Sequence, residues 1–328
     1  MEKIFRTIHV GCGTRGAGHL RNLMKSTMWE PVALVDIVER YFDDAVREYR
    51  FPRNHCYKSL KEAIENVEAD VAIISSPATT HAQFVQESLE ADLHVWVEKP
   101  FTCNLASAQY NVDLASKQGK KLMVGNQARF TPAQRTMRRL MAEKILGAPG
   151  YVTLIQHKVR PTPYNPSPHE QLWQMCVHNF DSVLAILQRE PVSIYAHSFV
   201  PPWSRYRESA TVSAIMAFSG GLILNFLSSS DSKVAFYEMR VECSDGALVQ
   251  PHYSEGDGIK LLRPNREEIV PLDEPPNGWN PDVWQFMMFY DYLTKDIEPE
   301  TSGRKNLATI AICDAAQRSA ESGEKLRF

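Results

Sequence analysis

Short apolar runs alternate with helical patterns through the first third of the chain. The runs are rich in β-branched residues and apolar at successive positions, and they cover residues 4–11, 29–37, 69–77, 93–100 and 120–127. Helical patterns separate them, at residues 15–27, 38–50, 80–92 and 104–119, with a shorter helical segment at 55–66. Strands that are apolar on both faces and separated by helices predict a parallel, doubly wound sheet.

The pattern changes after residue 126. Helices are expected at residues 132–146, 169–188, 279–296 and 304–325, and strands at 151–160, 192–200, 210–230, 237–250, 258–264 and 267–272. Turn signals such as Ser219-Gly220-Gly221 separate the strands, and the Pro-rich stretches 160–169 and 273–281 are typical of loops. We therefore expect an α/β domain over residues 1–125 and an α+β domain over residues 126–328.

Composition and charge narrow the class of protein. The chain has 328 residues, of which 44% are hydrophobic and 23% charged, enough for about two domains with sizeable cores. A net charge of -3 gives no reason to expect nucleic acid or an anionic membrane as a partner. The basic run in RTMRRLMAEK is interpreted as the solvated face of a helix.

The six cysteines form no C-x-x-C pair and no Cys/His cluster with zinc spacing, so we expect no metal. They are typical of reduced thiols in an intracellular protein. No apolar run approaches the ~20 residues of a membrane span, and the first residues enter a strand pattern directly. A cytoplasmic location is expected.

The stretch HVGCGTRGAGHL contains a glycine-rich motif that is typical of dinucleotide binding. Gly11, Gly13 and Gly16 form G-x-G-x-x-G between the first strand and the first helix, and the second strand ends in Asp36. These glycines suit a tight turn, a close approach to a pyrophosphate and close helix packing, and the acid suits the ribose hydroxyls. We expect NAD as cofactor, with NADP disfavoured because a carboxylate repels a 2′-phosphate. Arg15 could reach a phosphate, and the flanking Thr14 and Ile37 are added to the expected cofactor contacts.

The segment VEKPFT resembles a known signature. Glu98-Lys99-Pro100 is similar to the E-K-P motif of the glucose-fructose oxidoreductase / inositol dehydrogenase / rhizopine catabolism (Gfo/Idh/MocA) family. SSPATTH, VGNQARFTPAQ and the C-terminal helix, in that order, resemble further family segments, so the similarity spans nearly the whole chain. The resemblance implies a Rossmann domain, a C-terminal domain with an open, mostly antiparallel sheet, and pyridine-nucleotide redox chemistry on sugars or polyols. It also implies a homodimer or homotetramer.

The resemblance makes Lys99 a catalytic residue that donates a proton or a hydrogen bond to a carbinol oxygen. Pro100 helps to fix the turn that aims it, and His81 is interpreted as a helix residue near the cofactor. A further set completes the expected cofactor contacts: Ser76, Pro77, His81, Glu98, Lys99 and Gln127.

The helix containing WQMCVHNFD is expected to hold the base. Family dehydrogenases usually carry a histidine there, with an acid one turn earlier and an aspartate three residues later. His178 and Asp181 fit, but Gln174 stands where the acid is expected. At 3.6 residues per turn the three lie on one helix face. We expect His178 to act as base or proton shuttle, Asp181 to be a structural partner and Gln174 to bind substrate through its amide.

The remaining substrate candidates combine aromatic and polar side chains, which suit a polyhydroxylated ligand: Gln127, Arg129, Tyr164, His169 and Trp173. The leading hypothesis is an NAD-dependent oxidoreductase acting on a secondary alcohol of a sugar, polyol or glycoside. Two alternatives stay open. One is a lyase or glycosidase that oxidises its substrate transiently and recycles NAD. The other is a non-enzymatic regulator that binds nucleotide and sugar.

Overall fold

The computed structural model describes residues 3–160, 169–254 and 256–328, and the chain divides into two compact units. The first contains residues 1–125 and 282–310, and the second contains residues 126–281 and 311–328. Each unit is built around one sheet.

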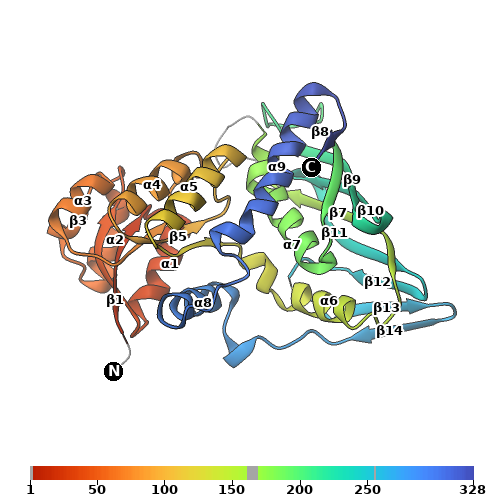
Figure 1. Ribbon diagram of the computed structural model, residues 1–328, viewed down its shortest axis with the longest axis horizontal. Coiled ribbons are helices and arrows are strands. Elements are labelled where there is room, and N and C mark those ends of the chain that lie inside the picture. Colours follow the sequence, from red (N-terminus) through yellow and green to blue (C-terminus); the bar gives the residue numbers. More distant parts are fainter. Residues whose placement is uncertain (1–2, 161–168, 255) are drawn as a thin grey trace. The chain divides into compact units, whose positions relative to one another are not determined.

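The first unit has a six-stranded sheet in the order β3-β2-β1-β4-β5-β6, and every neighbouring pair is parallel. Its strands are β1 (Phe5–Val10), β2 (Trp29–Val35), β3 (Cys56–Tyr57), β4 (Val71–Ile74), β5 (His94–Glu98) and β6 (Leu122–Gly125). Its helices are α1 (Thr14–Met24), α2 (Arg40–Tyr49), the 3-10 turn η1 (Arg53–His55), α3 (Leu60–Asn66), α4 (Ala78–Glu90), α5 (Leu105–Lys117) and α8 (Pro281–Lys295). The expected doubly wound parallel sheet is confirmed, and α4 and α5 lie side by side in Figure 1.

Two details of this unit were not expected. The segment 55–66 was predicted to be helical throughout, but Cys56 and Tyr57 pair with β2 before α3 begins at Leu60. The helix α8, which the sequence placed in the second domain, groups with the first unit. Its residues Phe286 and Phe289 join a buried cluster with Trp29 and Trp96 of the sheet, because their aromatic side chains need a large apolar surface to cover them.

The second unit has a nine-stranded sheet in the order β14-β13-β12-β11-β7-β10-β9-β8-β15. The strands are β7 (Pro149–Val159), β8 (Pro191–Phe199), β9 (Thr211–Phe218), β10 (Ile223–Ser229), β11 (Asp231–Cys243), β12 (Gly246–Gln250), β13 (Ile259–Arg263), β14 (Arg266–Val270) and β15 (Leu326–Arg327). All neighbours are antiparallel except β7 and β10, so the expected mostly antiparallel sheet is confirmed.

Helices cover one face of this second sheet (Figure 1). They are α6 (Pro132–Ala142), α7 (Val177–Leu187) and the part of α9 (Gly303–Ser322) that follows residue 310; the short turns η2 (Gln127–Phe130), η3 (Leu172–Cys176), η4 (Ser219–Gly221) and η5 (Pro276–Gly278) connect the elements. On β10, Leu224 and Phe226 are buried beneath the helices, whereas Asn225 between them is exposed. The alternation of buried and exposed positions marks the other face as uncovered.

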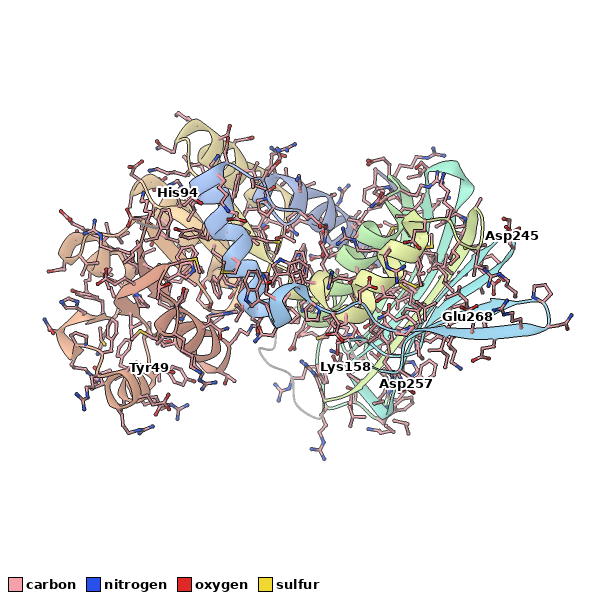
Figure 2. The ribbon with its side chains drawn as sticks, turned by 90° about the horizontal axis from the view of Figure 1, so that it is seen from below. Tyr49, His94, Lys158, Asp245, Asp257 and Glu268 are labelled. Atoms are coloured by element: carbon pink, nitrogen blue, oxygen red, sulfur yellow. The ribbon has the colours of Figure 1, made fainter. Side chains whose placement is uncertain are left out.

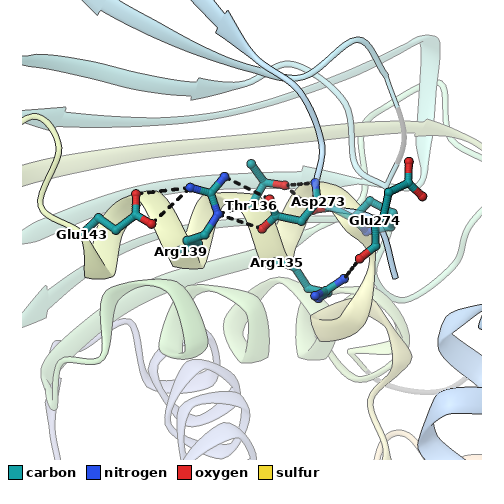
Figure 3. Close-up of polar contacts among 7 residues, drawn as sticks. Arg135, Thr136, Arg139, Glu143, Asp273 and Glu274 are labelled. Atoms are coloured by element: carbon teal, nitrogen blue, oxygen red, sulfur yellow. Dashed lines mark hydrogen bonds and ion pairs between the residues drawn. The ribbon is translucent and has the colours of Figure 1, made fainter. Parts of the chain in front are cut away.

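The basic side of α6 holds the segment that follows β14 (Figure 3). Arg139 donates hydrogen bonds to the carboxylates of Asp273 and Glu143, and Arg135 donates to the carbonyl oxygen of Glu274 at 2.7 Å. The hydroxyl of Thr136 accepts the backbone N–H of Asp273 at 2.8 Å. The basic run is therefore more than a solvated face, because it pairs with acids of this chain.

The edge strand β14 is strongly charged. Lys260 pairs with Glu267 at 3.0 Å across the β13–β14 hairpin, and Arg266 pairs with Glu268, which Figure 2 places on this hairpin. Charged side chains on an edge strand oppose further strand pairing.

Candidate active site

The glycine-rich turn follows β1 directly. Gly11 has a φ of +88°, and a Cβ there would lie 2.5 Å from the backbone nitrogen of Ser76. A Cβ on Gly16 would lie 1.8 Å from the carbonyl oxygen of Gly11. Both positions therefore require glycine for the protein's own packing, as a tight turn pressed against a helix does.

Gly13 differs from these two. Its φ is -64°, which any residue adopts, and a Cβ there would meet nothing closer than Tyr41 at 3.8 Å. Packing within the chain thus does not explain this glycine. Close approach of a ligand to the backbone explains it, and α1 begins at Thr14 with its first N–H groups at this turn. The residues present therefore fit a dinucleotide pyrophosphate.

Asp36 fastens the turn to the end of β2. Its Oδ2 accepts the backbone N–H of Cys12 at 2.7 Å, and its Oδ1 accepts the N–H of Val38 at 2.8 Å. Ile37, between these contacts, is 83% exposed, so its apolar side chain is available to a ligand. A carboxylate at this position is the group that receives ribose hydroxyls in dinucleotide-binding folds.

His81 connects two loops at the carboxyl edge of the parallel sheet. It is buried on α4, with Nδ1 2.7 Å from the carbonyl oxygen of Pro100 and Nε2 2.8 Å from that of Ser76. Burial lowers the pKa of His81, and the hydrogen bonds to the two carbonyl oxygens oppose this shift. Pro77 precedes α4 as its N-terminal flank.

The carboxylate of Glu98, at the end of β5, gathers three donors. Its Oε2 accepts the backbone N–H of Lys99 at 3.0 Å. Its Oε1 accepts Arg15 Nε at 2.6 Å and His19 Nε2 at 2.7 Å. Burial by itself would raise the pKa of Glu98, but His19 and Arg15 outweigh burial and hold that pKa well below its usual value. Glu98 is therefore a buried anion, and it bonds the N–H of the peptide group that joins it to Lys99.

The guanidinium of Arg15 has a second carboxylate partner. Nη1 and Nη2 donate to the two oxygens of Asp282, in the first turn of α8, at 3.0 and 2.6 Å. The expected contact of Arg15 with a cofactor phosphate stays a prediction, while its hydrogen bonds here go to acids of the chain.

In the second unit, Gln127 and Arg129 lie in η2, where the chain leaves β6. Arg129 donates from Nε and Nη2 to the two carboxylate oxygens of Asp181 at 2.9 and 2.6 Å. Both side chains are largely buried, so this bidentate pair ties η2 to α7. This contact gives Asp181 a structural role, and a substrate role for Arg129 and Gln127 stays a prediction.

The helix before His178 is not a regular α-helix. Residues Leu172–Cys176 form a π-helical turn, and α7 begins at Val177. Each π-helical residue turns the chain through a smaller angle than an α-helical one, which reduces the offset of about 40° that four α-helical residues leave. Gln174 therefore stays on the face of His178, by a different geometry from the one expected. From residue 171 to 183, every residue except Gln174 is buried.

The remaining substrate candidates contact elements of the second unit. The indole N–H of Trp173 donates to Gln317 of α9 at 2.8 Å, and His169 Nε2 lies 3.2 Å from Glu321 of the same helix. Tyr164 lies outside the described residues. These contacts anchor the π-helical turn, and a substrate role for Trp173 and His169 stays a prediction.

Sequence reasoning missed several polar residues. His19 and Asp282 were not singled out, although they complete the network around Glu98. On β7, Gln156 and Lys158 share the strand face that the helices cover, and Lys158 Nζ lies 5.1 Å from the ring centre of Tyr253. The sequence signal that could have identified Gln156 and Lys158 is their spacing, because polar residues two positions apart share the buried face of an otherwise apolar strand.

Comparisons with known proteins agree with this geometry. Residues 5–126 match the model of an oxidoreductase family with an NAD-binding Rossmann fold, and residues 134–249 match the GFO/IDH/MocA C-terminal domain. The chain belongs to the Gfo/Idh/MocA oxidoreductase family. The resemblance inferred from the E-K-P segment is therefore confirmed, and so is the expected NAD-binding Rossmann domain.

Relatives of this Gfo/Idh/MocA protein have low sequence identity to it, but the similarity covers most of each chain. The uncharacterized oxidoreductase YrbE of Bacillus subtilis is 24% identical and covers 98% of this chain and 96% of its own. The inositol 2-dehydrogenase of Rhizobium meliloti is 26% identical over 80% of this chain and 82% of its own. Among solved structures, the WlbA dehydrogenase of Bordetella pertussis with NADH and UDP-GlcNAcA has a TM-score of 0.86 at 18% identity, covering 100% and 99% of the two chains. At 18% identity, this structural similarity supports the fold and nothing beyond it.

The protein is thus an NAD(P)-dependent oxidoreductase of this family. Among the described residues, none of the helices is long and apolar enough to cross a membrane.

Proposed function

We propose that the protein oxidises a secondary alcohol of a sugar, polyol or glycoside, with the first unit as NAD-binding domain and the second as substrate-binding and oligomerisation domain. The observation that carries this proposal is Lys99, held by Glu98 at the carboxyl end of β5. The glycine-rich turn lies at the same edge of the sheet, two strands away. Ligands bind at this edge in open α/β sheets.

The protein's own groups divide the proton chemistry. Lys99 donates a hydrogen bond to the alcohol oxygen, and His178 accepts the hydroxyl proton. Gln174 holds a substrate hydroxyl by its amide. When bound, NAD supplies the acceptor for a hydride.

NAD is proposed in preference to NADP. Asp36 presents a carboxylate at the end of β2, where a 2′-phosphate would be repelled. Arg15 would be the nearby cation to offset that repulsion, but its guanidinium bonds Glu98 and Asp282.

A carbohydrate substrate is supported by the names of relatives, among them inositol 2-dehydrogenases. The experiment is a panel of sugars, polyols and glycosides with NAD, followed by absorbance of the reduced nicotinamide. Lys99→Ala and His178→Ala should each lower kcat by about 100-fold or more. The exposed Lys117→Ala and His197→Ala are the matched controls. Full activity in His178→Ala would contradict its assignment as the base.

The amide at Gln174 favours one second candidate, a lyase or glycosidase that recycles its NAD. An uncharged neighbour stabilises the imidazolium of His178 less than an acid would, which suits a transient oxidation. This candidate expects product without net NADH and nucleotide that copurifies. A nucleotide-free protein that needs stoichiometric NAD would exclude it.

We also propose that two copies associate through the uncovered face of the second sheet. Tyr151, Ile215 and Phe236 lie on that face and are each about half exposed. An apolar sheet face of this kind is typical of a surface that a second copy covers.

A further inference from the structure

Asp282 lies far along the chain from the glycine-rich turn, yet it belongs to the same unit. Aromatic side chains of α8 anchor the helix to the parallel sheet, where Phe289 stacks on Trp29 with ring centres 5.9 Å apart. This packing brings the first turn of α8 to the start of α1. The carboxylate of Asp282 then receives both terminal nitrogens of Arg15.

The contacts continue from Arg15 to Lys99. Arg15 is the second residue of α1, directly after the glycine-rich turn, and its Nε donates to Glu98 Oε1. His19, one turn later on α1, donates to the same oxygen. The other oxygen of Glu98 accepts the N–H of Lys99. One continuous set of hydrogen bonds thus joins α8, the start of α1 and the residue after β5.

We propose that Asp282 is a positioning residue, which orients Arg15 so that the glycine-rich turn and Lys99 are held in one fixed relation. The role of Lys99 in this inference rests on the proposed function. Asp282 touches neither reacting group in the proposal. It acts through Arg15, whose planar guanidinium is fixed in orientation only when both of its edges are bonded.

If Asp282 served only to fasten α8 to the sheet, its hydrogen bonds to Arg15 would not be needed. The helix is already held by its buried aromatic cluster, whereas the hydrogen bonds of Asp282 go to Arg15 at the start of α1, and Arg15 in turn bonds Glu98 beside Lys99. Glu98 has a side chain only 6% exposed, so its charge depends on Arg15 and His19 for compensation. Burial raises the energetic cost of a misplaced Arg15, because an uncompensated buried carboxylate is unfavourable.

The test compares Asp282→Asn with Asp291→Asn in the full-length protein. Asp291 is on the same helix and pairs with Lys295 at 2.8 Å, so the control removes an equivalent charge away from the turn. NADH titration by fluorescence should give a Kd about three- to tenfold higher in Asp282→Asn and unchanged in Asp291→Asn. A change in melting temperature alone, with both Kd values unchanged, would overturn the proposal.

A double-mutant comparison checks the route through Arg15. Arg15→Met should weaken NADH binding at least as much as Asp282→Asn, and combining the two should add less than twofold. Effects that multiply would mean that Asp282 acts independently of Arg15, against the proposal. Arg15→Lys keeps the charge without the planar group, so it should recover part of the affinity.

Lys99→Met provides a readout without turnover. If Asp282 positions Lys99, the effect of Lys99→Met on the NADH Kd should shrink by at least half in the Asp282→Asn background. On a substrate from the panel, Asp282→Asn should lower kcat about tenfold with KM within twofold. If no substrate is turned over while the Kd values respond as stated, the proposed function fails and the inference stands.

Discussion

At the scale of single residues, the buried charge of Glu98 sets a pH dependence. Its folded-state pKa is held below the ordinary value of 4.5 by His19 and Arg15, against the opposing effect of burial. A carboxylate with a depressed pKa stabilises the fold fully above its ordinary pKa, and this contribution is lost as the pH falls toward the folded-state value. The ion network therefore contributes at pH 7 and fades below about pH 4.5.

Glu98→Gln should accordingly lower the free energy of unfolding by about 3 kcal/mol at pH 7, because Arg15 and His19 lose their buried anion. Urea unfolding at pH 7 and at pH 3.5 measures the difference between wild type and variant. The difference should be smaller at pH 3.5. An equal difference at both pH values would contradict the assignment of a charged Glu98.

Gln174→Glu tests the amide that stands one turn before His178. The added carboxylate would stabilise the imidazolium, so the acid limb of the pH–rate profile should move to higher pH by about one unit. Gln174→Leu supplies no charge and should leave the limb in place. Identical profiles for Gln174→Glu and the wild type would mean that position 174 does not influence the base.

Much of this residue-scale picture was within reach of the sequence. The G-x-G-x-x-G spacing and Glu98-Lys99-Pro100 identified the turn and the lysine, because both motifs are local. His19 and Asp282 could not be found this way. Their partners lie 79 and 267 positions away, and only folding brings them together.

At the scale of elements, α6 holds the segment after β14 in place through hydrogen bonds (Figure 3). The buried hydroxyl of Thr136 accepts the N–H of Asp273, and it donates to the carbonyl oxygen of Pro132. Thr136→Val keeps the shape of the side chain but leaves a backbone N–H without this acceptor. We expect a loss of about 1–2 kcal/mol in the free energy of unfolding.

Denaturant unfolding of Thr136→Val measures that loss, with Thr136→Ser as the matched variant that retains the hydroxyl. Thr136→Ser should lose less stability than Thr136→Val. The reverse order would show that the methyl group, and not the hydrogen bond, matters at this position.

The order of helices and strands followed well from periodicity, since nearly every predicted element is present. Two departures have physical causes. The strand β3 has two residues, too few for a period-2 pattern to register. The π-helical turn at Leu172–Cys176 arises within a run whose apolar spacing fits an ordinary helix, and its anchors, such as Gln171 bonded to Ser228 of β10, are tertiary.

At the scale of the whole molecule, the uncovered sheet face should control association. Ile215→Glu places a charge on that face, so sedimentation should show a smaller species than the wild type. Ile297→Glu alters a similarly exposed isoleucine of the first unit and should leave the mass unchanged. A wild-type monomer would contradict the proposed homo-oligomer.

The division of the chain into its two units was the feature hardest to predict from the sequence. The notion of one domain per continuous segment placed residues 126–328 together, yet residues 282–310 group with the first unit. The sequence predicted a helix over residues 279–296, but not which sheet it packs against. That choice depends on surfaces formed by Trp29 and Trp96, far earlier in the chain.

The late arrival of α8 has a consequence for synthesis. A ribosome releases the chain from its N-terminus, at about 5–20 residues per second. The six strands of the first sheet emerge early, but the helix that covers Trp29 and Trp96 emerges only after more than 150 further residues. The nucleotide-binding unit therefore begins to form first and is completed almost last. The aromatic surface of its sheet is therefore not covered by α8 while the second unit is being synthesised.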